Sequence, residues 1–353
     1  MKTQTLTNRA AGQSGFTLLE LLVVVTLLAI LATGALVAYD GADEKAQSSR
    51  AANTIGALDQ GVRAYRAVTG AYPNQWDNLA DPVTGNLPAG GDDFIPARLQ
   101  TILGSLNLRA ALEGVYGAST VTDDYMEDFF VERFGFDEIQ HVFGTGIGDR
   151  GPVEPNRAHN EGTNPPDGSG NGAVETEFGD FLAAGNLATG APAFISILAS
   201  DAFDRDSGAS LGCTVGGELI TTTWGEVDDD GNRTPGIADP LVLNSINDAL
   251  STERCNLVLA VGFGGDAAQS TVDSSAGVVQ APTYTSKNVN PANQYARYIG
   301  LFLLAKGNKG NTGDGAGVED LDASNFLARP RLLGFIDTEG NTIDMNIAEA
   351  TRD

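Results

Sequence analysis

The sequence predicts an α+β protein, with a long N-terminal α-helix packed on an enlarged head built around an antiparallel sheet. Residues 16–39 form an apolar run with a single formal charge, Glu20. Residues 40–70 then repeat apolar side chains at helical spacing. From residue 192 onward, short segments rich in β-branched and aromatic residues alternate with glycine-containing turns, which is typical of strands.

The apolar run is long enough to cross a membrane. As a helix, residues 16–39 would measure about 36 Å, whereas a bilayer hydrocarbon core is about 30 Å thick. Lys2 and Arg9 precede the run without any acidic residue. Basic flanks stay in the cytoplasm, so the chain after the run is expected to face outward. An ionisable side chain inside such a run is costly, which makes Glu20 a functional candidate.

The second part of the helix is expected to be amphipathic and to hold the head. Apolar side chains follow one another there at spacings of four, three, four and three: Ala51, Ile55, Leu58, Val62 and Tyr65. This spacing places them on one helical face. Gly70 is expected to end the helix, because glycine is the preferred residue just after a helix C-terminus.

The start of the apolar run resembles the processing site of type IV pilins and type II secretion pseudopilins. The residues that carry the resemblance are Gly15-Phe16-Thr17-Leu18-Leu19-Glu20 and the apolar tail after them. The resemblance implies that a prepilin peptidase cleaves between Gly15 and Phe16 and that the new N-terminus at Phe16 is methylated. It also implies that Glu20 neutralises the N-terminal amine of an adjacent subunit. The alternative is a single-pass anchor whose glutamate is protonated or reaches the membrane surface.

Together these observations divide the chain. We expect a leader peptide over residues 1–15, a transmembrane and filament-core helix over 16–39, and an amphipathic helix over 40–70 that continues into the head. The acidic α+β head would cover 71–353. Within it, residues 144–173 are rich in Gly, Pro, Asn and Asp and are expected to form a flexible loop.

Local patterns predict the elements of the head. The Tyr72-Pro73 segment resembles the loop that follows the long helix in major pseudopilins. Helices are expected over residues 97–113, 123–143 and 241–250. Strands are expected over residues 193–198, 218–224, 256–263, 298–304 and 331–336, with a final turn at 338–341 leading into a strand over 342–347.

The two cysteines, Cys213 and Cys255, both follow the apolar run. In an exported head, such a pair predicts a disulfide rather than a metal site. The bridge would close a loop worth about 3–4 kcal/mol in the chain-entropy account. Two free buried thiols are the alternative.

An acidic segment inside that loop suggests a calcium site. Side-chain oxygens stand at alternate positions around a glycine: Glu226, Asp228, Asp230 and Asn232. This resembles the start of a calcium-binding loop. Major pseudopilins bind calcium, so the family resemblance supports calcium as the cofactor. However, Ile237 stands where an EF-hand carries its bidentate glutamate, and a plain acidic turn remains open.

No arrangement of residues in the sequence suits catalysis. Ser210 lies in a G-x-S-x-G string, but the only histidines, His141 and His159, precede it, whereas the histidine follows the serine in that fold. The net charge of −25 would repel nucleic acid. We therefore expect neither an enzyme nor a nucleic-acid partner.

The sequence thus predicts a structural subunit of a type IV filament-class assembly, most like a type II secretion pseudopilin. The expected partners are a prepilin peptidase, other pilin or pseudopilin subunits and the inner membrane. The N-terminus would be cytoplasmic and the head periplasmic or extracellular. The alternative is a minor or tip pilin whose enlarged acidic head is a binding or adhesion module.

Overall fold

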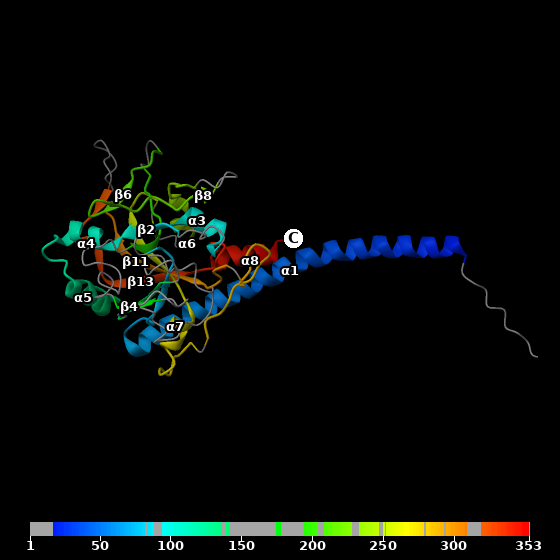
Figure 1. Cartoon of the computed structure of the whole chain (residues 1–353), viewed down its shortest axis with the longest axis horizontal. Coiled ribbons are helices and arrows are strands. Elements are labelled where there is room, and N and C mark those ends of the chain that lie inside the picture. The colour runs from blue at the N-terminus through cyan, green and yellow to red at the C-terminus, as the bar shows by residue number, and fades with distance from the viewer. Residues whose placement is uncertain are drawn as a thin grey trace, which may run out of the picture. The chain divides into compact units, whose positions relative to one another are not determined.

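The structure is a computed structural model, and Figure 1 shows its elements. It describes residues 17–81, 84–87, 94–135, 138–141, 174–177, 194–203, 208–227, 233–246, 250, 252–278, 280–292, 294–308 and 319–352. The chain divides into two compact units, Met1–Ala46 and Gln47–Asp353. The predicted loop over residues 144–173 lies outside the described residues.

The first element is helix α1, Leu18–Thr69, which runs without a break for 52 residues. Its end is set by Gly70, whose φ of 84° is readily adopted only by glycine and whose N–H donates to the Arg66 carbonyl at 2.8 Å. The predicted long helix and its glycine stop are therefore confirmed.

Within the second unit, α1 buries the predicted apolar face. Ala51, Ile55, Leu58 and Val62 are each at most 3% exposed. Tyr65 is half-buried. Helix α8, Ile343–Thr351, lies alongside this part of α1 (Figure 1).

The main sheet of the second unit is mixed but mostly antiparallel. Along one path its strands are β13 (Phe326–Ile336), β11 (Ile299–Lys306), β10 (Asn256–Gly262), β1 (Trp76–Asn78), β3 (Glu138–His141) and β4 (Val174–Glu177). A branch from β10 adds β5 (Phe194–Leu198) and then β2 (Leu103–Asn107). Strand β10 forks the sheet because Val258 pairs with Leu198 of β5, while Gly262 at its end pairs with Asp77 of β1. Only β1 and β3 pair in parallel within this described sheet.

Shorter elements surround this sheet. The helices are α3 (Ala97–Ile102), α4 (Leu108–Tyr116), α5 (Asp123–Phe134), α6 (Pro240–Ile246) and α7 (Gly265–Gln269). Two small sheets join β12 (Glu319–Leu321), β6 (Cys213–Val215) and β7 (Glu218–Leu219), and separately β8 (Glu226–Val227) and β9 (Arg233–Thr234).

The centre of the sheet is buried on both faces. Leu257 and Leu259 of β10 belong to one apolar cluster, which includes the buried face of α1. Val258 and Ala260 belong to a second cluster, with Leu99 of α3. Successive residues of a strand point to opposite faces, so these two clusters lie on the two sides of the sheet. The predicted α+β class, a long helix packed on a sheet-based head, is confirmed.

The predicted helix over residues 97–113 is wrong in its middle, where β2 separates α3 from α4. The spacing of Leu103 and Leu106 suits a helix, but all five residues of β2 pair with β5. A Cβ on Gly104 would collide with the Thr222 carbonyl, so the close approach needs glycine there. Sheet pairing overrides the local helical pattern.

The predicted helix over residues 123–143 is too long. Helix α5 ends at Phe134, because Gly135 adopts a φ of 81° and donates its N–H to the carbonyls of Phe130 and Val131. Strand β3 then follows at Glu138–His141. The helix over residues 241–250 also differs, since α6 covers Pro240–Ile246.

The predicted C-terminal strand over residues 342–347 is wrong, because this segment begins helix α8. The Thr342 hydroxyl accepts from the Met345 N–H at 3.4 Å, and Asp344 lies in the first turn. Threonine at the N-cap and an acid in the first turn both favour a helix start.

The strand predicted over residues 218–224 is also wrong beyond its start. Only Glu218–Leu219 forms a strand, and a single bridge then joins Thr222 to Ile237. The predicted strands at 193–198, 256–263, 298–304 and 331–336 correspond to β5, β10, β11 and β13. Strand β1 lies in the segment after Tyr72-Pro73, which the sequence suggested only as a loop.

Candidate functional site

Glu20 forms hydrogen bonds with Thr17 that cap the N-terminus of α1. Its Oε2 accepts from the Thr17 N–H at 3.0 Å and from the Thr17 hydroxyl at 2.9 Å, while the Glu20 N–H donates to the Thr17 hydroxyl at 3.3 Å. This reciprocal arrangement is a capping box, which satisfies N–H groups that have no partner inside the helix. The Thr-x-x-Glu spacing is the sequence signal for this box and identifies Thr17 as a further functional residue, which the charge of Glu20 alone does not. Gly15 and Phe16 lie outside the described residues.

The helix after Glu20 exposes a long apolar surface. Large apolar side chains between residues 18 and 36 are from 48% exposed, at Val23, to 84% exposed, at Leu18. The hydroxyls of Thr26 and Thr33 donate to carbonyls within the helix, at 2.9 and 2.8 Å. By length and composition, α1 can cross a membrane. Because its polar groups are satisfied internally, this segment is a candidate membrane anchor.

At its other end, α1 is fastened to β13 by hydrogen bonds. Arg63 donates to the Leu332 carbonyl at 3.1 Å, and Arg66 donates to the Pro330 carbonyl at 3.2 Å. Tyr72, which is 2% exposed, accepts from both Arg66 and the Leu332 N–H, the latter at 3.0 Å. The tyrosine after the helix therefore anchors the helix end to the sheet.

A third arginine contacts β13 from α5. Arg133 donates to the Leu327 carbonyl at 2.9 Å, and its guanidinium lies 4.1 Å from the ring centre of Phe129. Strand β13 ends the described sheet, so its polar backbone would otherwise be open on one side. Side chains of α1, α5 and the Tyr72 loop cover it.

We expect Tyr72→Phe to lower the free energy of unfolding by about 1–3 kcal/mol, because the buried Leu332 N–H and the Arg66 guanidinium lose a partner. Ring packing on Phe302, at a centroid distance of 4.8 Å, is retained. Chemical denaturation measures the change. Tyr65→Phe is the matched control, since the structure gives the half-buried Tyr65 hydroxyl no hydrogen bond within the described residues. Equal stability of the Tyr72 variant and the wild type would contradict the anchoring role.

A buried carboxylate lies in β1, directly after Trp76. Asp77 is 3% exposed, and its Oδ2 accepts from the Tyr295 hydroxyl at 2.7 Å. Burial raises the pKa of Asp77 to about 7, although the Tyr295 hydrogen bond and the nearby charge of Arg297 act to lower it. A Cβ on Gly264 would lie 2.5 Å from both carboxylate oxygens, so glycine makes room for this group. Asp77 is not among the predicted site residues, because its partner Tyr295 lies 218 positions away in the sequence.

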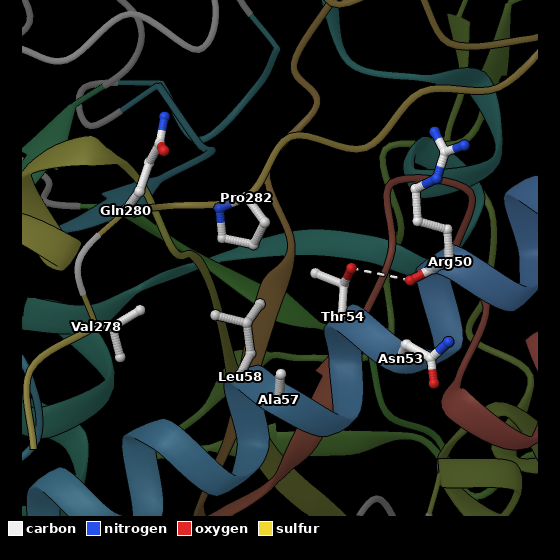
Figure 2. Close-up of a pocket in the computed structure, with 8 residues that line it drawn as sticks. All are labelled: Arg50, Asn53, Thr54, Ala57, Leu58, Val278, Gln280 and Pro282. Carbon is white, nitrogen blue, oxygen red and sulfur yellow. Dashed lines mark hydrogen bonds between the residues drawn. The ribbon is translucent and has the colours of Figure 1, made fainter.

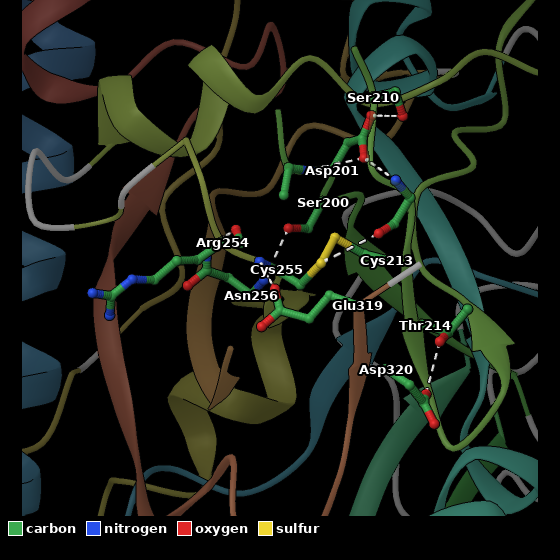
Figure 3. The surroundings of a disulfide bond; sticks show 12 residues. Ser200, Asp201, Ser210, Cys213, Thr214, Arg254, Cys255, Asn256, Glu319 and Asp320 are labelled. Carbon is green, nitrogen blue, oxygen red and sulfur yellow. Dashed lines mark hydrogen bonds between the residues drawn. A yellow bond between two sulfur atoms is a disulfide. The ribbon is translucent and has the colours of Figure 1, made fainter. Parts of the chain in front are cut away.

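The predicted disulfide is confirmed: Cys213 and Cys255 are bonded, their Cα atoms are 5.5 Å apart, and both are fully buried. Figure 3 shows acidic side chains around the bridge that are already engaged. Asp201 accepts from the Ser210 hydroxyl at 2.5 Å, and Glu319 accepts from the Cys255 N–H at 2.9 Å. These carboxylates hold the loops that flank the bridge.

Comparison with known proteins finds one family match at the start of the chain and one similar protein that aligns over a short segment. Residues 11–36 match the family described as "Prokaryotic N-terminal methylation motif". The N-terminal part of the chain is type IV pilin-like. A similar protein is "Type II secretion system core protein G" of Aeromonas hydrophila, with 41% identity over 67 residues, which are 19% of this chain and 47% of that protein. The match thus spans about half of that relative. No solved structure matches the chain significantly.

The matched residues 11–36 include Gly15, Phe16 and Glu20, whereas the predicted calcium ligands lie far from them in the sequence. Glu226 belongs to β8 and is exposed, whereas Asp228, Asp230 and Asn232 lie outside the described residues. The described residues contain no group of three or more His, Cys, Asp or Glu side chains suited to a metal. The calcium site therefore stays a prediction, and β8–β9 pairing through Val227 and Arg233 brackets its loop.

Proposed function

We propose that the chain is a structural subunit of a type IV filament-class assembly, most like a type II secretion pseudopilin. The observation that carries the proposal is the methylation motif over residues 11–36, followed by an exposed apolar helix that continues into the head. In this proposal, a prepilin peptidase cleaves between Gly15 and Phe16. Before assembly, the subunit is anchored in the inner membrane with its head on the periplasmic or extracellular side. It then polymerises through α1 with other pilin-type subunits.

Glu20 has two tasks in this proposal. Its bonds to Thr17 order the first turn of α1, and its negative charge neutralises the amine of Phe16 on an adjacent subunit. A carboxylate in an apolar filament core is tolerable only when it is paired, because an unpaired charge in such surroundings is strongly disfavoured. The pairing would therefore fix the axial register between neighbouring helices.

Three variants separate these tasks. Glu20→Gln removes the charge but can still cap, Thr17→Val removes the hydroxyl cap but keeps the charge, and Glu20→Ala removes both. We expect all three to be processed and membrane-bound. Glu20→Gln and Glu20→Ala should yield at least about tenfold less polymer, corresponding to the loss of at least about 1.4 kcal/mol per contact, whereas Thr17→Val should still assemble.

Mass analysis of the mature N-terminus and quantification of sheared filaments test this scheme. Normal assembly by Glu20→Gln would show that the charge is dispensable. Equal defects in Thr17→Val and Glu20→Gln would assign the effect to the helix cap instead. An intact Met1, or cleavage near Ala35, would contradict the processing step.

A second candidate function is a minor or tip subunit whose head binds a partner. The extent of the head favours it, since the second compact unit covers Gln47–Asp353 while the relative aligns over only 67 residues. Calcium bound at residues 226–232 would fit either role. Immunogold labelling of the head separates the two, because a tip subunit would be confined to filament ends and a core subunit would be spread along the filament.

A further inference from the structure

A groove lies between α1 and the segment at residues 278–282, with a volume of about 370 Å³ (Figure 2). Its apolar lining includes the buried Leu58, the half-buried Val278 and Pro282, and the exposed Ala57. Arg50, Asn53 and Gln280 stand around it, and all three are exposed. On the α1 wall, the Thr54 hydroxyl is already engaged, since it donates to the Arg50 carbonyl at 2.9 Å within the helix.

Every polar side chain around this groove can donate a hydrogen bond: the guanidinium of Arg50, the amides of Asn53 and Gln280, and the hydroxyl of Thr54. The structure gives the side chains of Arg50, Asn53 and Gln280 no hydrogen bond or ion pair within the described residues, although the charge of Arg50 acts on the nearby Tyr298. None of the lining residues is acidic. A guanidinium binds a carboxylate through two parallel hydrogen bonds, and amide N–H groups add further donors. The groove is therefore complementary to a carboxylate carried on a partly apolar segment.

We propose that this groove docks a carboxylate-bearing segment of a second copy of the same chain. The inference rests on the proposed function, because α1 both forms one wall of the groove and carries the segment assigned to assembly. A second copy suits the charge of the groove, since the chain has 46 acidic residues against 21 basic ones. Arg50 is thus an attractive contact between copies that otherwise repel one another at a net charge of −25.

Zero-length cross-linking of the assembled full-length chain tests the groove. In Arg50→Lys, a carbodiimide can couple the introduced amine to a carboxylate in contact with it, and mass spectrometry identifies the linked peptide. Mixing isotope-labelled and unlabelled chains shows whether the link joins two copies. We expect a link between position 50 and an Asp or Glu of another copy, and Arg50→Gln supplies the background without an amine.

Groove variants made in the Arg50→Lys background provide the controls. Ala57→Trp and Asn53→Trp each place a bulky side chain in the groove without adding a carboxylate near position 50, so each should reduce the link at least about tenfold. Ala64→Trp makes the same change at an exposed α1 residue that does not line the groove, and should leave the link intact. Asn53 and Ala57 are both exposed, so both variants should retain the fold.

The outcomes distinguish this inference from the proposed function. A link only within one chain, a link to a different protein, or an unchanged link in Asn53→Trp would overturn the groove proposal. Filaments would still form in that case and would still depend on Glu20. Failure of the wild-type chain to assemble at all would instead overturn the proposed function.

Discussion

Replacing Asp77 with asparagine is expected to stabilise the head at pH 8 and to leave its stability almost unchanged at pH 4. The carboxyl is buried, and its pKa rises from 3.8 to about 7 in the folded chain. Between these two values the folded state binds more protons than the unfolded state. The free energy of unfolding therefore falls as the pH rises through this range, by as much as about 4 kcal/mol from this group alone.

Asparagine imitates the protonated carboxyl, because its amide oxygen can accept from the Tyr295 hydroxyl without carrying a charge. Denaturation of the wild type and Asp77→Asn in detergent should show a difference of about 2–4 kcal/mol at pH 8 that vanishes towards pH 4. Tyr295→Phe is the complementary variant. It removes the hydrogen bond that stabilises the anion, so the folded-state pKa of Asp77 should rise further and the loss of stability should continue to higher pH. A pH-independent difference for Asp77→Asn would contradict this account.

Removing the Cys213–Cys255 bridge is the second large change that we expect. The cysteines are 42 positions apart in sequence and join β6 of a small sheet to the start of β10 at the centre of the main sheet. In the chain-entropy account, the double substitution of both cysteines by alanine should lower the free energy of unfolding by about 4 kcal/mol. Alanine suits both positions because they are fully buried.

Chemical denaturation of the oxidised wild type, the reduced wild type and the double variant measures this effect. The reduced wild type and the double variant should unfold at similar, lower denaturant concentrations. A double variant as stable as the oxidised protein would show that the bridge does not constrain the unfolded chain. Slow reduction in the absence of denaturant is also expected, since both sulfur-bearing residues are fully buried.

The spacing of apolar residues correctly predicts the elements whose surroundings in the fold match that spacing. The α1 face from Ala51 to Val62 is buried as its spacing required. Strand β10 has a continuous apolar sequence because both of its faces are covered. By contrast, β2 looks helical in isolation, and only its pairing with β5 makes it a strand. Helix α8 begins at a threonine cap, Thr342, which the prediction of a strand over these residues does not take into account.

The polar sites were harder to predict than the apolar core. Gly15, Phe16 and Glu20 belong to a contiguous motif, and the cysteine pair was the only one available. The partners of Asp77 and Tyr72 are far away in sequence: Tyr295 lies 218 positions from Asp77, and Leu332 lies 260 positions from Tyr72. No local pattern indicates such contacts, because they depend on which strands meet in the folded sheet.

The side chains that cover the outer edge of β13 matter when many heads lie close together. Subunits stored in a membrane or stacked in a filament would reach local concentrations at which open sheet edges join into cross-β aggregates. Arg63, Arg66 and Arg133 occupy backbone carbonyls of this strand, Tyr72 occupies one of its N–H groups, and Pro330 has no N–H to offer. An incoming strand would first have to displace these groups. This edge of the sheet is therefore protected against pairing with a neighbouring head.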